Sequence, residues 1–377
     1  MPQLSEVRFR SSPHLDLKQL GDLAAEQREA FRELERDPDF YGLLIPRPPL
    51  TMNLQSVARP TADLFQTLSA PSYLDGAVTQ DVVDLVLDGI LEIESDDGFV
   101  SGADALPLLC SSSRQPEVRD AAALLSRNAL LHAQDLETRE PRQLMMALYL
   151  YNRIPISLFW KERFANREAV LAHIGADRGS LQTLLERDWN ASHETAGWLS
   201  WSSKSRVPRR QDALTYKLYV SPRPERIREA FAAVVRVLMD FPGTQFKIGD
   251  GASGILRSDK LVAYFSTREE LDAAAAQLHR ELGGCDAHGV PFTAALDDTG
   301  LLSWGVDPPK NERVLRWLGG ISWRYWIAQR LGAALSIAKF ARSASAVEPW
   351  AFAIERVRRQ GVDVETWTPS ATLWSHS

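Results

Sequence analysis

The chain has 377 residues, of which 45% are hydrophobic and 24% charged, and its net charge is −6. This composition is ordinary for a soluble globular protein, and the length suggests two or three domains. No apolar run reaches the roughly 18 residues that a membrane-spanning helix needs. The first residues do not form a signal peptide, so we expect a cytoplasmic protein without a membrane partner.

The charge is unevenly distributed along the chain. Residues 201–377 carry 24 lysine and arginine against 19 aspartate and glutamate, a net charge of +5, which leaves −11 for residues 1–200. The pattern suits an anion-binding second half, although an ordinary solvated surface explains it equally well. The two cysteines, Cys110 and Cys285, and the scattered histidines show no metal-ligand spacing, so we expect reduced thiols and no metal.

Residues 1–110 are expected to form a helical region with a winged-helix-like element. A helix is predicted over 16–37 and a proline-rich loop over 46–49. Helices near 62–69 and 79–88 then precede two short strands around the turn 96–98, an order typical of a winged helix. The many carboxylates between 75 and 97 would repel DNA, so no nucleic-acid partner is expected. An architectural role and capture of a leader peptide by strand addition both stay open.

Residues 111–205 are expected to form a second helical region. Helices are predicted over 117–133, 141–153 and 166–189, the last one broken near 175–177. The segment that begins at Trp198 is interpreted as a linker into the next region. Its tryptophans would cover a sheet or a substrate peptide. Its basic cluster would attract a phosphopeptide or lie exposed; the cluster consists of Lys204, Arg206, Arg209 and Arg210.

Residues 206–310 predict an α+β domain with cationic side chains on one face of a sheet. The alternation in 215–222 turns Lys217 and Tyr219 to the same face of a strand. The strand 245–248 turns Lys247 away from its apolar face, and Arg257 stands at the mouth of a further strand. Helices over 224–240 and 268–283 separate these strands. Such a face would make a pocket for a doubly charged oxyanion.

The segment 249–254 matches Gly-x-Gly-x-x-Gly, but the residues after it are typical of a turn into a strand. A dinucleotide site needs a helix there, so we expect a flexible hairpin beside Lys247 and no nucleotide cofactor. Residues 311–377 are expected to be a helical C-terminal extension, with a tryptophan-rich helix over 313–341 and one more helix from 350 onwards. The first of these carries Arg324 and Arg330.

The order of elements over 215–302 resembles the HopA1 family, which is itself similar to effector phosphothreonine lyases and to the lyase domains of lanthipeptide and thioamitide synthetases. The resemblance lies in the Lys217-Leu-Tyr219 strand, the helix, the Lys247 strand, Arg257-Ser-Asp followed by Val-Ala-Tyr-Phe, a second helix, and Gly289-Val-Pro-Phe-Thr. The effector lyases have Lys-x-His where this chain has Lys217-Leu-Tyr219. The fold class implied is α+β, a phosphothreonine-lyase-like domain behind a helical first half.

The resemblance implies β-elimination of phosphate without metal or organic cofactor. Lys247 would be the base and Tyr219 the acid, while Lys217, Arg257 and the later Arg324 and Arg330 would bind phosphate. A lysine has a pKa of about 10.4 in water, so burial or neighbouring cations must lower it. The same cations would make Tyr219 a stronger acid.

The substrate implied is a phosphorylated precursor peptide whose phosphoserine or phosphothreonine becomes a dehydroamino acid. A separate Ser/Thr kinase would be a partner, because the chain carries no kinase sequence. Two alternatives stay open. One is a non-catalytic subunit that binds a phosphopeptide or a leader peptide, since replacement of a catalytic residue can turn a lyase fold into a binding module. The other is an effector that acts on host signalling proteins.

Overall fold

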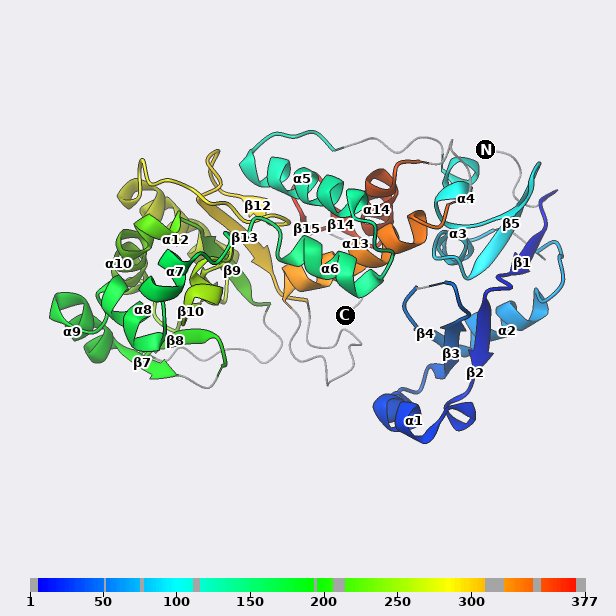
Figure 1. Ribbon diagram of the computed structural model, residues 1–377, viewed down its shortest axis with the longest axis horizontal. Helices are drawn as coiled ribbons and strands as arrows, with labels where there is room; N and C mark the ends of the chain where they lie inside the picture. Colours follow the sequence, from blue (N-terminus) through cyan, green and yellow to red (C-terminus); the bar gives the residue numbers. More distant parts are fainter. Residues whose placement is uncertain are drawn as a thin grey trace.

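The computed structural model describes residues 6–50, 52–74, 78–110, 116–192, 195–205, 214–308, 322–341 and 347–370, and the fold is α+β, as predicted. In Figure 1 a sheet with its helices occupies one end of the elongated molecule, a group of long helices the centre, and small N-terminal sheets the other end. No described helix is long and apolar enough to cross a membrane.

The largest sheet has seven antiparallel strands in the order β12-β13-β9-β11-β10-β8-β7. The strands are β7 Trp189–Ser192, β8 Trp198–Ser203, β9 Tyr216–Val220, β10 Gln245–Gly249, β11 Leu261–Phe265, β12 Ala294–Ala295 and β13 Leu302–Val306. Leu218 and Phe246 point to the face that α10 (Ile227–Leu238) and α12 (Arg268–Glu281) cover, and Phe231 of α10 lies 5.9 Å from the Phe246 ring. This apolar packing leaves the opposite face for polar side chains.

Shorter helices surround this sheet. They are α7 Leu158–Arg163, α8 Arg167–Ile174, α9 Gly179–Asp188, α11 Ala252–Ile255 and the 3-10 turn η4 Pro224–Arg226. The break predicted near 175–177 is present, because Gly175 ends α8 with φ of 75°. Glycine adopts this left-handed conformation without steric cost.

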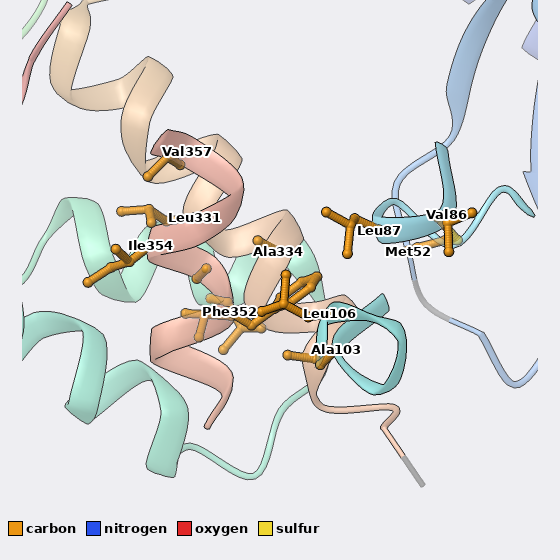
Figure 2. Packing of buried hydrophobic residues seen from close by; sticks show 14 of the residues in the cluster. Met52, Val86, Leu87, Ala103, Leu106, Leu331, Ala334, Phe352, Ile354 and Val357 are labelled. Carbon is orange, nitrogen blue, oxygen red and sulfur yellow. The ribbon is translucent and has the colours of Figure 1, made fainter. Parts of the chain in front are cut away.

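The central helices build a second core. They are α3 Gln80–Leu87, α4 Gly102–Leu109, α5 Ala121–Asp135, α6 Pro141–Tyr149, α13 Trp323–Ala338 and α14 Pro349–Arg359. Figure 2 shows Leu106 of α4, Leu331 and Ala334 of α13 and Phe352 of α14 in one buried cluster. Gly332 lets α13 approach α6 closely, since a Cβ there would lie 2.7 Å from the Met145 nitrogen.

The N-terminal region contains the elements of the predicted winged helix and strands that the sequence analysis did not predict. Helix α2 (Arg59–Thr67), α3 and the β5–β6 hairpin (Leu91–Ser95, Gly98–Val100) follow the expected order, and β1 (Phe9–Ser11) adds a third strand. A separate sheet joins β2 Leu15–Lys18, β3 Phe40–Pro46 and β4 Gln55–Ala58. The remaining elements are η2 Leu20–Asp22, α1 Ala25–Phe31, η3 Arg32–Arg36, β14 Val362–Asp363 and β15 Thr368–Pro369.

Three local predictions are wrong. The expected linker at Trp198 is strand β8, held between β7 and β10, because Trp201 stacks on Phe246 at 5.2 Å and is buried. The glycine segment contains the helical turn α11, packed so closely that a Cβ on Gly249 would lie 2.4 Å from Gly254. The helix predicted over 16–37 is also wrong at its start, because strand β2 extends to Lys18 and the helical turns η2, α1 and η3 follow it. Arg206, Arg209, Arg210 and the start of the tail helix near 313 lie outside the described residues.

The buried side chains form two large clusters that cross the four predicted segments. One cluster joins side chains from Phe9 to Leu148 with Phe292 and with side chains from Trp323 to Trp367. The other runs from Phe164 to Leu302 and contains the seven-stranded sheet. The C-terminal helices therefore complete the core of the first half of the chain.

Candidate active site on the polar face of the sheet

Three of the predicted site residues share the polar face of the sheet. In the antiparallel ladders Lys217 lies opposite Tyr264, while both Tyr219 and Lys247 lie opposite Val262. Directly opposite residues of antiparallel strands point to the same face. Lys217 and Tyr219 of β9 and Lys247 of β10 therefore share one face on either side of β11, as the alternation predicts.

Lys247 is the half-buried lysine of this face. Its ammonium lies 4.2 Å from the ring centre of Trp198 and 5.6 Å from that of Tyr264. Within the described part of the chain, no carboxylate lies at ion-pair distance from it. Burial, followed by the positive charge of Lys217, lowers the pKa of Lys247 to about 8. About a tenth of the Lys247 amine is thus neutral at pH 7, far more than for a lysine in water.

Lys217 is buried and paired with a carboxylate. Its Nζ lies 2.6 Å from Oδ1 of Asp307, which follows β13, and 5.3 Å from the ring centre of Tyr264. Asp307 compensates the charge of Lys217 and also opposes the lowering of the pKa of Lys247. The sequence analysis gave Lys217 a role in binding phosphate and assigned no role to Asp307.

Asp259 joins two arginines from different parts of the chain. Arg257 donates from Nε to Oδ1 at 2.7 Å and from Nη2 to Oδ2 at 2.8 Å, and Arg324 of α13 donates from Nη1 to Oδ2 at 2.7 Å. Burial alone would raise the pKa of the Asp259 carboxyl, but the charge of Arg324 and the hydrogen bonds of Arg257 outweigh it and hold the pKa well below its usual range. One carboxylate therefore fixes two guanidinium groups. The trio of Arg257, Asp259 and Arg324 keeps a net positive charge.

Tyr149, the last residue of α6, connects the helical core to this arginine pair. Its hydroxyl oxygen accepts a hydrogen bond from Arg257 Nη2 at 2.9 Å, and its carbonyl accepts one from Arg324 Nη2 at 3.1 Å. Both guanidinium carbons lie 5.2 Å from the centre of its ring. Arg257 also lies 5.6 Å from the ring of Trp198, so Tyr149, Arg257 and Lys247 form a continuous row.

Tyr219 is fully enclosed, which contradicts its expected chemistry. It packs in a small buried cluster with Val262 and Val290, against Tyr264. Burial, followed by the negative charge of Asp307, raises the pKa of Tyr219 well above its ordinary value. The expectation that neighbouring cations make Tyr219 a stronger acid is wrong, because the loss of water and the nearby carboxylates outweigh those cations.

Of the two arginines predicted from the tail, the structure places Arg324 in the cluster and Arg330 outside it. Six residues along an α-helix turn the side chain by about 240°, so Arg330 points away from Arg324. Its guanidinium carbon lies 3.4 Å from the ring centre of Trp326. Arg330 therefore covers a buried tryptophan of α13, and its predicted contact with phosphate has no geometric support.

A buried polar pair lies next to the cluster in sequence. Lys260 donates from Nζ to the carbonyl of Pro222 at 2.9 Å and lies 2.8 Å from Nδ1 of His288. Burial lowers the pKa of Lys260 to about 7 and that of His288 to about 3. The pair holds the loop before Gly289 against the end of β9, and Asn152 donates to the carbonyls of both His288 and Gly289.

The electrostatic balance of the cluster suits a dianion. Lys217, Lys247, Arg257 and Arg324 contribute four positive charges when Lys247 is protonated, and Asp259 and Asp307 contribute two negative charges. The excess is two positive charges with Lys247 protonated and one with Lys247 neutral, so the cluster attracts a phosphate monoester in either state, and arginine binds its oxygens in a fork. Among the described residues, no group of three His, Cys, Asp or Glu side chains could hold a metal ion.

Sequence reasoning missed Tyr149, Asp259, Asp307 and the cation–π contact of Trp198. Asp259 stands inside the Arg-Ser-Asp segment used for the resemblance, two residues after Arg257, which is a signal for a local ion pair. Nothing in the sequence near Tyr149 indicates its contact with Arg257, because that contact depends on where tertiary packing places the end of α6.

No protein-family model and no curated protein sequence matches the chain. Among solved structures, an effector protein from Pseudomonas syringae pv. tomato strain DC3000 is 13% identical, covers 67% of this chain and 99% of its own, and gives a TM-score of 0.40. An effector protein from Pseudomonas syringae pv. syringae strain 61 is 12% identical, covers 68% of this chain and 100% of its own, and gives a TM-score of 0.37. The chain is thus similar to these effector proteins at an identity and a TM-score too low to support an argument about activity.

Proposed function

We propose that the protein is a phosphoserine and phosphothreonine lyase. It would remove phosphate by β-elimination from a phosphorylated precursor peptide and leave dehydroalanine or dehydrobutyrine. The observation that carries the proposal is Lys247, a half-buried lysine whose pKa is lowered to about 8 on a face with excess positive charge. The resemblance to the HopA1 family over 215–302 supports the same chemistry. It also suggests peptide natural-product biosynthesis of the lanthipeptide or thioamitide type, with a separate kinase as partner.

Lys247 has the properties of a general base for the Cα proton. A base works best when its pKa lies near the operating pH, where a useful fraction is neutral and still basic. Lys247 reaches this range because burial and Lys217 disfavour its charged form. Its aromatic contacts with Trp198 and Tyr264 hold the amine in place without neutralising it.

The arginine pair has the properties of a phosphate clamp. Arg257 uses Nε and Nη2 for Asp259 and Tyr149, and no described residue accepts from its Nη1. That nitrogen remains for an oxygen of the phosphate. The hydrogen bonds of Asp259 and Arg324 fix Arg257 before substrate binds, so little reorganisation accompanies the charge that develops on the leaving group.

The enclosed Tyr219 favours a second candidate function, a non-catalytic subunit that binds a phosphopeptide or a leader peptide. The acid that the resemblance implies, Tyr219, is buried, and its pKa is raised instead of lowered. Such a subunit would bind a phosphopeptide saturably, with weaker binding in Arg257→Ala, and would release no phosphate.

Incubation of the protein with phosphoserine and phosphothreonine peptides, followed by mass spectrometry, separates the two candidates. A lyase gives peptides that have lost the mass of phosphoric acid, and Lys247→Ala and Arg257→Ala abolish this loss while circular dichroism shows a folded protein. Lys18→Ala, which removes an exposed lysine on the N-terminal sheet, is the matched control and keeps full turnover. If the wild type binds the peptides without any mass loss, also with a kinase and ATP present, the lyase function is refuted and the binding subunit is favoured.

A further inference from the structure

The proposed reaction needs a proton donor for the departing phosphate oxygen, and the tyrosines of the cluster differ in their surroundings. Tyr219 is enclosed by Val262 and Val290. Tyr264 is half-buried, and burial followed by the charges of Asp307 and Asp259 raises its pKa. Both side chains are thus placed where the loss of a proton is disfavoured.

Tyr149 is the tyrosine whose oxygen receives a hydrogen bond from a cation. Arg257 Nη2 donates to its hydroxyl oxygen at 2.9 Å, and Arg257 and Arg324 both stand 5.2 Å from its ring. A phenol has a single proton and can accept while it donates. Because Arg257 occupies an acceptor position and no described residue accepts from this hydroxyl, the proton of Tyr149 remains for a substrate oxygen.

The contacts of the Tyr149 backbone and of Lys247 also support a role for Tyr149. Arg324 Nη2 donates to the carbonyl of Tyr149 at 3.1 Å, so the end of α6 is fixed by the same arginine that holds Asp259. Arg257 and Lys247 lie over the ring of Trp198, at 5.6 and 4.2 Å from its centre. Arg257, the proposed phosphate clamp, thus bonds to the Tyr149 hydroxyl and shares the Trp198 ring with Lys247.

We propose that Tyr149, supplied by the helical core, is the general acid of the elimination and protonates the bridging oxygen of the leaving phosphate. This inference rests on the proposed lyase function. The neutral amine of Lys247 takes the Cα proton, the electrons of that C–H bond form the Cα=Cβ double bond, and the Cβ–O bond breaks.

The electron pair of the broken Cβ–O bond goes to the phosphate oxygen, which takes the proton of Tyr149 and leaves as hydrogen phosphate dianion. The phenolate that remains faces the two guanidinium groups, which stabilise its charge. Transfer of the extra proton from the Lys247 ammonium to this phenolate, directly or through solvent, restores both groups. No oxidant, reductant or second substrate is needed.

Tyr149→Phe is the first test, because it removes the hydroxyl and keeps the ring beneath the two arginines. Removal of a general acid lowers kcat by about 100-fold to 10,000-fold. The Kd for the phosphopeptide is expected to change by less than about threefold, since the clamp of Arg257 and Asp259 is intact. Tyr325→Phe is the matched control: its ring packs edge-on against Tyr149 at 5.6 Å, and its loss of a hydroxyl leaves kcat unchanged.

Replacement of Tyr149 by 3-fluorotyrosine is the second test, and it reports proton donation directly. Fluorine makes a phenol more acidic, so the alkaline limb of the kcat–pH profile shifts to lower pH if this hydroxyl must be protonated. A residue with a purely structural role would leave that limb unmoved. The substitution also preserves the hydrogen bond from Arg257, which keeps the test valid should the phenylalanine variant fold poorly.

The outcomes separate this inference from the proposed function. An active wild type with an equally active Tyr149→Phe variant, or with an unshifted alkaline limb for the fluorinated protein, overturns the role of Tyr149 and leaves the lyase function standing. Loss of activity in Tyr219→Phe beside a fully active Tyr149→Phe assigns the acid to Tyr219. A wild type that binds phosphopeptide and releases no phosphate overturns both proposals.

Discussion

Substitution of Lys217 by methionine tests the electrostatic control of Lys247. Lys217 is, after burial, the largest cause of the lowered pKa of Lys247. Both ammonium nitrogens lie within 5.6 Å of the ring centre of Tyr264. The two charges are therefore at most about 11 Å apart, and at an effective dielectric constant of about 20 they repel by at least about 1.5 kcal/mol.

A repulsion of about 1.5 kcal/mol corresponds to about one pKa unit. The pKa of Lys247 is accordingly expected to rise from about 8 to about 9 in Lys217→Met. At pH 7 the neutral fraction of Lys247 would fall from about 9% to about 1%. The matched control is Lys217→Met combined with Asp307→Asn, which removes one charge of each sign and leaves the pKa near that of the wild type.

NMR titration of protein labelled with ¹³C at the lysine Cε atoms measures this pKa without any substrate. Lys247→Arg identifies the resonance by its disappearance. An unchanged pKa in Lys217→Met refutes the reasoning, because it means that solvent screens the two ammonium groups from each other. An equal rise in the single and the double variant would instead assign the effect to lost packing around Lys217.

Three further predictions concern stability. A Cβ on Gly332 would collide with the backbone of Met145, so Gly332→Ala should lower the free energy of unfolding by about 1–3 kcal/mol in urea titrations, against the helix propensity of alanine. Arg324→Leu removes one partner of the buried Asp259 and should cost about 3 kcal/mol, seen as a lower Tm; an unchanged Tm would show that Arg257 alone suffices. The folded chain releases the Lys260 proton near pH 7, whereas the unfolded chain keeps it up to about pH 10, so stability should rise over this interval in the wild type and less in Lys260→Met.

The sequence was sufficient for the features that depend on local periodicity. The two-residue period of 215–222 and 245–248 predicted which face carries Lys217, Tyr219 and Lys247, and the strand ladders place them on that face. The amphipathic patterns of α10 and α12 likewise predicted the helices that cover the opposite face. Strand β8 was missed, because a serine-rich and tryptophan-rich segment is typical of loops as well as of edge-near strands.

Features that arise from long-range packing could not be predicted from the sequence. Tyr219 is enclosed by Val290, which arrives from a loop some seventy residues later, so its burial could not be read from its own strand. Asp259 contacts Arg257 and Arg324, and both arginines bond to Tyr149, so this network joins three segments of the chain. The alternation of apolar and polar residues along a strand predicts the sheet face to which each side chain points. Its neighbours there depend on tertiary packing.

Two side chains from the helical core complete the cluster on the face of the seven-stranded sheet. Tyr149 and Arg324 lie on α6 and α13, while Arg257 and Asp259 lie beside the sheet. Transplanting residues 206–310 into another scaffold would accordingly carry away the amine and one guanidinium but leave the second guanidinium and the phenol behind. Any engineered relative that keeps this constellation must preserve the seam between the two cores as faithfully as the strands themselves.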